Sequence, residues 1–487
     1  MNNATIKPYT IIPGDLISFV PKHRDIAKIS NVIGQGTYGC VHKPSLRCKQ
    51  KNVSYKNKIS KILKTSDADI EMNEYNTIDK VDPHHDFYLG KPIKCIPDNS
   101  NINIKSIELC QDPQQFLEEF NDLSLLIIED GGINLEEFAQ KIDDWDVTPE
   151  NIEKIEIFWM EAHRILTGLR VFINHGMVHH DLKPQNFVYD ISKNRVNFID
   201  FGLMTTRDTI IKESISSEYH LGKFHWSFPF EIQFYNKSAF DNFTSKTETQ
   251  KKTYYQKFIR DFKKSSTSKN GNDIANALKT FFYYTIKSDL SKNEYENIIK
   301  LYFEDYYRMI IYELNKDTKY EDFLKKSIDT FDIYGTGIAF FCVLSHSLRF
   351  LDESLVNSLT GLFYFMVTPN LQTRMNINTL IHKYENILKN HGLLTKYNKH
   401  FENHHLMNGP EMPMDISSKL ATIEKKDVAI SREEMDRIIL SKIRECPPGK
   451  EYKPSTRRCV KQCKDGYIRN VHFKCTKNKT RKLSIRI

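Results

Sequence analysis

The sequence holds no long uninterrupted apolar run and no internal repeat, and its first residues lead us to expect no secretory leader. Residues 1–14 hold polar residues and prolines where a signal peptide would need an apolar core. The most apolar stretch, residues 333–344, is interrupted by polar residues and glycines at 334–337. It is also too short to cross a bilayer, so we expect a buried helix there. We therefore expect no membrane span and no secretion.

The composition is that of an ordinary globular protein. Apolar residues make up 40% of the chain and charged residues 27%, which does not indicate a disordered protein. A length of 487 residues is too great for one compact core and suggests two domains with additional segments. Nine cysteines in a chain for which we expect no leader indicate a reducing compartment with mostly free thiols.

The positive charge of the chain belongs to its C-terminal tail. Residues 446–487 hold 13 Lys and Arg against Glu451 and Asp465, a net charge of +11, whereas the whole chain carries +8. Such a tail attracts nucleic acid or an acidic partner through counterion release, or serves only as a solubilising or packaging segment. For the tail cysteines a zinc site, two disulfides and unpaired thiols all remain open, because no C-x2-C pair occurs among them. These cysteines are Cys446, Cys459, Cys463 and Cys475.

The pattern of apolar residues predicts an α+β fold with β-rich and helical parts. Strands are predicted at 32–33, 40–42, 59–63, 123–129, 187–189 and 196–199, and helices at 67–80 and 150–176. A mostly helical remainder is expected to run to about residue 389, with helical spacing at 275–284 and 295–314 and a flexible stretch at 265–272. Residues 1–28 form an N-terminal extension, and 390–445 form a connector with one amphipathic helix predicted at 432–444.

A glycine-rich loop of the form G-x-G-x-x-G-x-V is the first chemical motif. Without Cβ atoms a hairpin can close over a triphosphate and offer its backbone N–H groups. The pattern alone is weak, because dinucleotide-binding folds also use it and because a glycine hairpin can be incidental. A dinucleotide fold would need a helix directly after the third glycine, whereas an extended segment and Pro44 follow here. The candidate ATP-binding residues are Ile33, Gly34, Gln35, Gly36, Thr37, Tyr38, Gly39, Cys40 and Val41.

The segment Val178–Asn186, with sequence VHHDLKPQN, is much more specific. Phosphoryl transfer needs a carboxylate that accepts the proton of the attacking hydroxyl, and Asp181 is predicted to do this. Lys183 would supply a cation near the developing phosphate charge, and Asn186 an oxygen for Mg²⁺. The alternative for His179 and His180 is a pair of core histidines or a metal pair.

A second magnesium ligand is predicted shortly after this segment. Fourteen residues after Asn186, the strand at 196–199 leads into Asp200-Phe201-Gly202. The carboxylate of Asp200 would hold the Mg²⁺ that bridges the β- and γ-phosphates. An isolated Asp-Phe-Gly is common by chance, but its spacing from Asp181 makes chance a poor explanation.

Together these motifs resemble those of eukaryotic-type serine/threonine protein kinases, over residues 30–235 and 329–389. The resemblance implies a bilobal fold, with an N-lobe at about 29–130 and a C-lobe at about 131–389 that carries an insertion at about 236–328. It implies ATP, Mg²⁺ and a protein substrate. The N-lobe and the tail also resemble kinases and other proteins of giant DNA viruses of the mimivirus type, which implies the cytoplasm of an infected host cell or the virion.

Kinases orient the α- and β-phosphates with a strand lysine that a helix glutamate holds. The resemblance favours Lys61 for the lysine, with Lys64 as the alternative, and Glu74 for the glutamate, with Glu71 as the alternative. Glu129 would lie where the two lobes are joined and contact the nucleotide.

Three further residues are expected to be structural. The segment from Asp200 resembles a kinase activation segment and ends at Glu231, although its last residues are shifted by one position from the usual Ala-Pro-Glu. Asp332 would brace the backbone of the catalytic loop, and Arg374 would form a buried ion pair with Glu231.

The residue before Asp181 is His180, where regulated kinases usually carry an arginine that binds a phosphate on the activation segment. Histidine is a weaker donor and is mostly neutral at pH 7. We therefore predict that activity does not require phosphorylation of this segment. Two other functions remain as alternatives to an active kinase: a pseudokinase scaffold, and a nucleic-acid-binding protein that acts through its tail.

Overall fold

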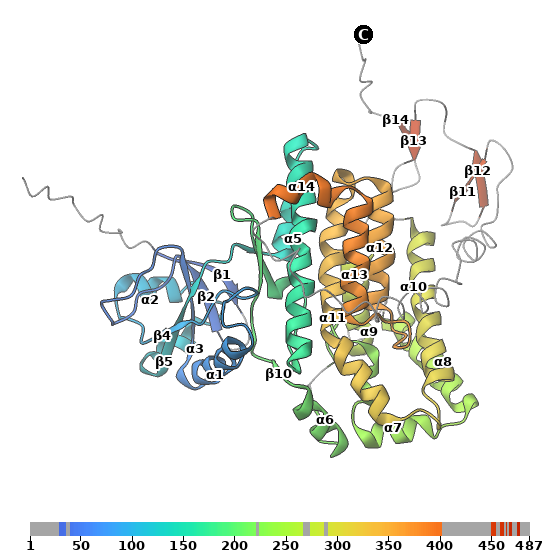
Figure 1. The fold of residues 1–487 in the computed structure, drawn as a ribbon, viewed down its shortest axis with the longest axis horizontal. Coiled ribbons are helices and arrows are strands. Elements are labelled where there is room, and N and C mark those ends of the chain that lie inside the picture. Colours follow the sequence, from blue (N-terminus) through green and yellow to red (C-terminus); the bar gives the residue numbers. More distant parts are fainter. Residues whose placement is uncertain are drawn as a thin grey trace, which may run out of the picture. The chain divides into compact units, whose positions relative to one another are not determined.

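The computed structural model of the chain describes residues 29–35, 39–220, 224–265, 273–286, 291–401, 450–453, 458–461, 464, 467–469 and 475–477 (Figure 1). The N-terminal extension, the tip of the glycine-rich loop at 36–38 and the predicted helix at 432–444 lie outside these ranges. Residue contacts divide the chain into two compact units, Met1–Tyr75 with Gly90–Asp130, and Asn76–Leu89 with Gly131–Ile487. The fold is α+β, with a sheet in the first unit and mostly helices in the second.

The first unit is built on a five-stranded antiparallel sheet, drawn in blue tones in Figure 1, with the order β1-β2-β3-β5-β4. The strands are β1 (Asn31–Gln35), β2 (Gly39–Lys43), β3 (Lys58–Lys64), β4 (Ile93–Cys95) and β5 (Leu123–Glu129). The strands predicted from the sequence in this part of the chain are confirmed. Strand β4 and the short helices α2 (Asn101–Ile107) and α3 (Pro113–Glu118) were not predicted, because they are brief and carry little periodicity.

The two faces of this sheet have different partners, because side chains alternate along each strand. One face carries Cys40, Ile62 and Leu125, which form an apolar cluster with residues from α2 and α3. The other carries Leu63 and Leu126, which pack with Ala68 at the start of α1 (Thr65–Val81). Lys61 faces the α1 side, since it alternates with Ile62 and pairs with Leu126 across the ladder.

Two disulfide bonds lie in the first unit, Cys40–Cys110 and Cys48–Cys95. The prediction of mostly free thiols is therefore wrong for these four cysteines. Spacing along the sequence could not reveal the pairs, because 70 and 47 residues separate their members and the sheet brings them together. Cys342 is a free, buried cysteine.

Helix α5 (Pro149–Asn174) is the central predicted helix of the second unit, and it is confirmed. The hydroxyl of Thr148 accepts a hydrogen bond from the N–H of Asn151 and caps the helix, and Pro149 occupies its first turn. Its inward stripe is buried, as the helical spacing predicted. The stripe consists of Ile155, Phe158, Trp159, Ala162, Ile165, Leu166, Leu169 and Phe172.

Short strands hold the motif-bearing loops of the second unit. One sheet has the order β6-β8-β9, and a second pairs β7 with β10. The strands are β6 (Ile133–Asn134), β7 (Met177–Val178), β8 (Phe187–Asp190), β9 (Arg195–Phe198) and β10 (Thr205–Thr206). The helices around them are α4 (Leu135–Asp143), α6 (Arg207–Ile215), α11 (Tyr320–Ser347), α12 (Glu353–Val367), α13 (Ile377–Asn390) and α14 (Leu393–Phe401).

Helix α11 contains the apolar stretch for which a buried helix was predicted. Among the described residues, one helical stretch, Tyr320–Phe350, has the length and hydropathy of a membrane span, but 94% of its apolar window is buried inside the structure. This burial is typical of a core helix. Gly335 has a packing role within it, because a Cβ atom there would lie 2.2 Å from the carbonyl oxygen of Leu182 in the loop Val178–Asn186.

The predicted insertion is helical, with α7 (Lys237–Thr244), α8 (Glu248–Ser265), α9 (Asp273–Thr285), α10 (Lys292–Arg308) and a π-helical turn at Met309–Glu313. Residues 266–272, in the predicted flexible stretch, lie outside the described residues. In the tail, β11 (Lys450–Lys453) pairs with β12 (Arg458–Lys461), and β13 (Tyr467–Arg469) pairs with β14 (Cys475–Lys477). Cys446 and Cys463 lie outside the described residues, so all three interpretations of the tail cysteines stay open.

Candidate functional site

The backbone of the loop Val178–Asn186 is held by a buried carboxylate from α11. Asp332 accepts hydrogen bonds from the backbone N–H groups of His179 (2.7 Å) and His180 (3.0 Å). Burial raises the pKa of Asp332 to about 7, although these two donors favour its charged form. The predicted bracing contact of Asp332 is confirmed.

Three predicted site residues meet within this loop. The ammonium of Lys183 lies 2.9 and 2.7 Å from the two carboxylate oxygens of Asp181. The side-chain nitrogen of Asn186 donates to the backbone carbonyl of Asp181 at 2.6 Å and to its carboxylate at 2.8 Å. Because the nitrogen of Asn186 makes both bonds, its amide oxygen keeps its lone pairs for a metal ion. The loop therefore presents a carboxylate, an ammonium and an amide oxygen together.

Asp200 reaches the same region through the strand that precedes it. The N–H of Ile199 donates to the carbonyl of Asn186 at 3.1 Å, so the chain enters Asp200 beside the end of the loop. Asp200 is exposed and has a φ of 61°, whereas Phe201 is buried against the rings of His179 and Tyr88. The buried phenylalanine thus fixes the segment while the carboxylate remains accessible to a cation.

In the first unit, the ion pair predicted between Lys61 and Glu74 is corrected in its glutamate. The ammonium of Lys61 lies 2.7 Å from the carboxylate of Glu71, the alternative given by the sequence analysis. Lys64, the rival lysine, pairs with Glu119 near the surface. Glu71 lies on the same inward stripe of α1 as Ala68 and is 7% exposed, whereas Glu74 lies one turn later and is only half-buried. That stripe was the sequence signal that favoured Glu71.

The glycine-rich loop is described only at its flanks, because Gly36, Thr37 and Tyr38 lie outside the described residues. A Cβ atom at Gly39 would lie 2.8 Å from the backbone oxygen of Ile62 and 3.2 Å from Cε of Lys61, so glycine leaves room for the lysine. Cys40 points to the opposite face of the sheet and is bound in a disulfide. Any contact of Cys40 with a nucleotide is therefore limited to its backbone.

The remaining candidates for nucleotide binding differ in their exposure and in their contacts with other residues. Gly34 has open space around its Cα apart from Val41, and Ile33 is 41% exposed. The side-chain oxygen of Gln35 accepts a hydrogen bond from the N–H of Gln111 at 2.6 Å. Glu129 is exposed and forms an ion pair with Lys58 on the neighbouring strand.

His180 contacts two parts of the segment that follows Asp200. Its Nδ1 lies 3.3 Å from the carbonyl oxygen of Leu203 and its Nε2 lies 3.3 Å from the hydroxyl of Tyr219. A carbonyl only accepts, so Nδ1 carries the proton and Nε2 accepts from Tyr219. Burial lowers the pKa of His180 to about 4, so the ring is neutral at pH 7. Sequence reasoning did not identify Tyr219, because no local pattern distinguishes it.

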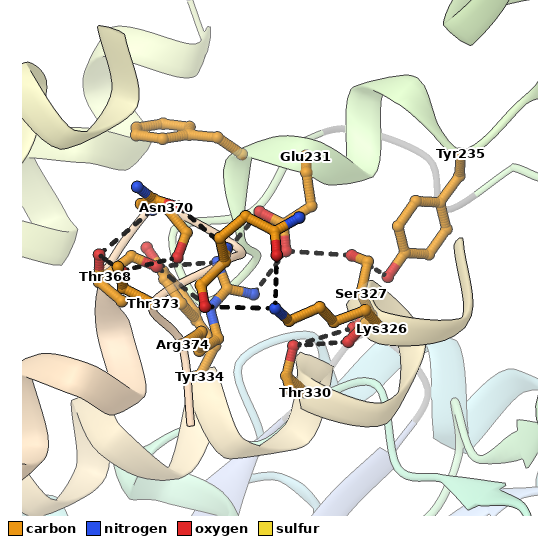
Figure 2. A network of polar contacts seen from close by, with 12 residues as sticks. Glu231, Tyr235, Lys326, Ser327, Thr330, Tyr334, Thr368, Asn370, Thr373 and Arg374 are labelled. Carbon is orange, nitrogen blue, oxygen red and sulfur yellow. Dashed lines mark hydrogen bonds and ion pairs between the residues drawn. The ribbon is translucent and has the colours of Figure 1, made fainter. Parts of the chain in front are cut away.

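The predicted ion pair between Glu231 and Arg374 is confirmed, and Figure 2 shows it within a buried polar network. The guanidinium donates to both carboxylate oxygens, at 2.5 and 3.1 Å, and neither side chain is exposed. The hydroxyl of Ser327 in α11 donates to the same carboxylate at 3.0 Å, and Arg374 also donates to the carbonyl of Thr368. These bonds tie the end of the segment that begins at Asp200 to the helical core.

A contact between helix α9 and the loop Val178–Asn186 was not predicted. The hydroxyl of Tyr284, at the end of α9, donates to Glu136 in α4 and lies 2.9 Å from the side-chain nitrogen of Gln185. Its ring stacks on Trp226, with ring centroids 4.5 Å apart. Gln185 lies between Lys183 and Asn186, so the insertion reaches the loop that carries the candidate catalytic residues.

These contacts place Asp181, Lys183 and Asn186 together, with Asp200 entering beside them, while Lys61 and Glu71 form their own pair in the first unit. Searched against models of known protein families, the sequence matches no family model.

Proposed function

We propose that this protein is an ATP- and Mg²⁺-dependent serine/threonine protein kinase with a bilobal kinase fold. The observation that carries the proposal is the mutual hydrogen bonding of Asp181, Lys183 and Asn186 on a loop whose backbone is held by Asp332. Phosphoryl transfer requires a carboxylate, an ammonium and a magnesium-binding oxygen, and Asp181, Lys183 and the side-chain amide of Asn186 can supply them. The resemblance of the motifs to kinases supports the same conclusion.

Asp181 would accept the proton of the substrate hydroxyl as its oxygen attacks the terminal phosphorus of ATP. Lys183, which already contacts Asp181, would offset the negative charge that develops on the transferred phosphoryl group. In the first unit, Lys61 would bind the α- and β-phosphates, and Glu71 would hold its ammonium in place. The ion pairs Lys183–Asp181 and Lys61–Glu71 hold the two ammonium groups in place, which lowers the cost of ordering them around a phosphate.

Asn186 and Asp200 would hold Mg²⁺. Their amide and carboxylate oxygens are the ligands that this ion prefers. Because the nitrogen of Asn186 donates to Asp181, the amide oxygen of Asn186 is left to bind the ion. When bound, Mg²⁺ neutralises charge on the β- and γ-phosphates. The exposed position of Asp200 suits a ligand that also contacts a nucleotide.

The direct test is transfer of radiolabelled phosphate from ATP to a generic basic protein substrate in the presence of Mg²⁺. The wild-type chain should yield phosphoserine or phosphothreonine, and Asp181→Ala should reduce the rate to background. Asp144→Ala removes an exposed carboxylate at the end of α4 and should leave the rate unchanged. Transfer by Asp181→Ala at the wild-type rate, or no transfer by the folded wild-type protein, would refute the proposal.

A further inference from the structure

The first unit contains a buried histidine that its surroundings do not explain. His42 in β2 is 0% exposed and belongs to neither the proposed catalytic residues nor a salt bridge. Its Nδ1 is buried and has no hydrogen-bond partner among the described residues. Its Nε2 lies 3.4 Å from the sulfur of Cys110. An imidazole needs a partner for each ring nitrogen when it is removed from water, so this position calls for an explanation.

The disulfide between Cys40 and Cys110 does not satisfy this histidine. A disulfide sulfur carries no proton and is only a weak acceptor. In the oxidised state His42 is therefore a polar group inside an apolar cluster, where a phenylalanine would pack at lower cost.

The same three side chains form a set of metal ligands. Cys40 and His42 are two residues apart on β2 and so point to one face of the sheet, and Cys110 reaches that face from beyond α2. The sulfur atoms and a ring nitrogen all lie within 4.8 Å of one another, and all three residues are buried. Two thiolates and a neutral imidazole are typical zinc ligands, and they leave one tetrahedral position for a further ligand.

We propose that Cys40, His42 and Cys110 form a zinc site when the Cys40–Cys110 disulfide is reduced. In the reduction, a thiol or phosphine reductant gives two electrons to the disulfide, the S–S bond breaks, and each sulfur takes up one proton. Binding of Zn²⁺ then releases these two protons, because the ligands are thiolates. His42 supplies the third ligand without a change in charge. The oxidised protein keeps the S–S bond and cannot bind the ion in this way.

This site is independent of the proposed kinase activity and of the tail cysteines. It lies on the face of the sheet opposite to Lys61, and its ligands come from the first unit alone. Metal bound by the tail would not depend on His42. The dependence of zinc content on His42 therefore isolates the proposed site.

The experiment uses the full-length chain, reduced with a phosphine, incubated with Zn²⁺ and freed of excess metal by gel filtration. Elemental analysis should find one more zinc ion per chain in the wild-type protein than in His42→Phe. The double variant Cys48→Ser/Cys95→Ser removes the neighbouring disulfide and should retain that ion. The untreated, oxidised wild-type protein should hold no His42-dependent zinc.

Two further measurements keep the test decisive. His42→Phe removes a buried polar group, so in the oxidised state its melting temperature should equal or exceed that of the wild type. Cys110→Ser should lose the same ion, and Co²⁺ added to the reduced wild type should give a thiolate-to-metal absorption band that both variants lack. Equal zinc content in reduced wild type and His42→Phe, or equal loss in the Cys48→Ser/Cys95→Ser control, would overturn the proposal.

Discussion

The hydroxyl of Tyr219 lies 3.3 Å from Nε2 of His180, and both side chains are buried. Through this contact the segment after Asp200 is bound to the loop Val178–Asn186 by a neutral hydrogen bond. Where regulated kinases usually bind a phosphate through arginine, this chain offers an uncharged ring whose nitrogens already contact Leu203 and Tyr219.

Phosphorylation of this segment should therefore be unnecessary for activity. Replacing its hydroxyl residues together by alanine should change kcat by less than about tenfold, which corresponds to about 1.4 kcal/mol in transition-state free energy. The residues are Thr205, Thr206, Thr209, Ser214, Ser216 and Ser217. Tyr219→Phe, which removes only the bond to His180, should lower kcat more than this set does. A larger loss from the alanine set would contradict the prediction.

Glu71 and Glu74 allow a matched comparison on one helix. Glu71→Gln removes the charge that pairs with Lys61 and should lower kcat/KM for ATP by about tenfold. Glu74→Gln changes the same chemical group one turn later and should lower it by less than about threefold. Steady-state kinetics with varied ATP measures both. The reverse order of effects would restore Glu74 as the functional partner.

Gly335 and Gly361 provide a second matched pair. Gly335→Ala would bring a Cβ atom to 2.2 Å from the carbonyl oxygen of Leu182, so α11 or the loop Val178–Asn186 must move. We expect it to lower the free energy of unfolding by about 1–3 kcal/mol and to reduce activity. Gly361→Ala in α12 meets no atom within 4 Å and should be neutral or stabilising by about 0.5–1 kcal/mol. Thermal unfolding measures the melting temperature of both variants. Equal melting temperatures would show that the close approach of Gly335 to Leu182 does not limit stability.

The free energy of unfolding should decrease as the pH is lowered below 6.5, because histidines such as His180 are buried. Its pKa is about 4 in the folded protein and 6.5 as its ordinary value, so the unfolded chain binds more protons between these limits. Stability is therefore fully present above pH 6.5 and is lost as the pH falls toward 4. This one group should cost roughly 2 kcal/mol at pH 5.

The variant His180→Gln tests this pH dependence. Between pH 7.5 and pH 5, the melting temperature of the wild type should fall further than that of the variant. His42 and His225 have pKa values lowered to about 4 by burial and act equally in both proteins. Parallel curves for the two proteins would show that His180 is not buried in its neutral form.

Local patterns were sufficient for much of the fold and for placing Asp181, Lys183 and Asn186 on one loop. The α5 helix follows from its apolar spacing and its Thr-Pro start, and Asp181, Lys183 and Asn186 lie close together in the sequence, so one loop suffices to gather them. The pairing of Arg374 with Glu231 joins distant residues, and only the resemblance to kinases made it predictable.

Contacts that depend on tertiary packing were not accessible in this way. The disulfide partners of Cys40 and Cys48 come from segments that the sheet brings near, and the stacking of Tyr284 on Trp226 depends on how the insertion packs. Glu71 was the exception, because its place on the buried stripe of α1 could be read from the sequence. Glu74 was predicted because Thr77 and Ile78, which follow it, were expected to pack inward.

Within nine residues of helix α11, Ser327 contacts Glu231, and Asp332 and Gly335 contact the loop Val178–Asn186. A shift of this helix by one residue would rotate it by about 100°, and all three contacts would be lost together. The rotation of α11 about its axis is therefore set by contacts in its first sixteen residues. The preceding helices add to them, because the hydroxyl of Tyr302 in α10 bonds that of Tyr334 and the ring of Phe281 in α9 stacks on the Tyr334 ring. A change in the length of these helices that shifted α11 would turn Asp332 away from the loop Val178–Asn186.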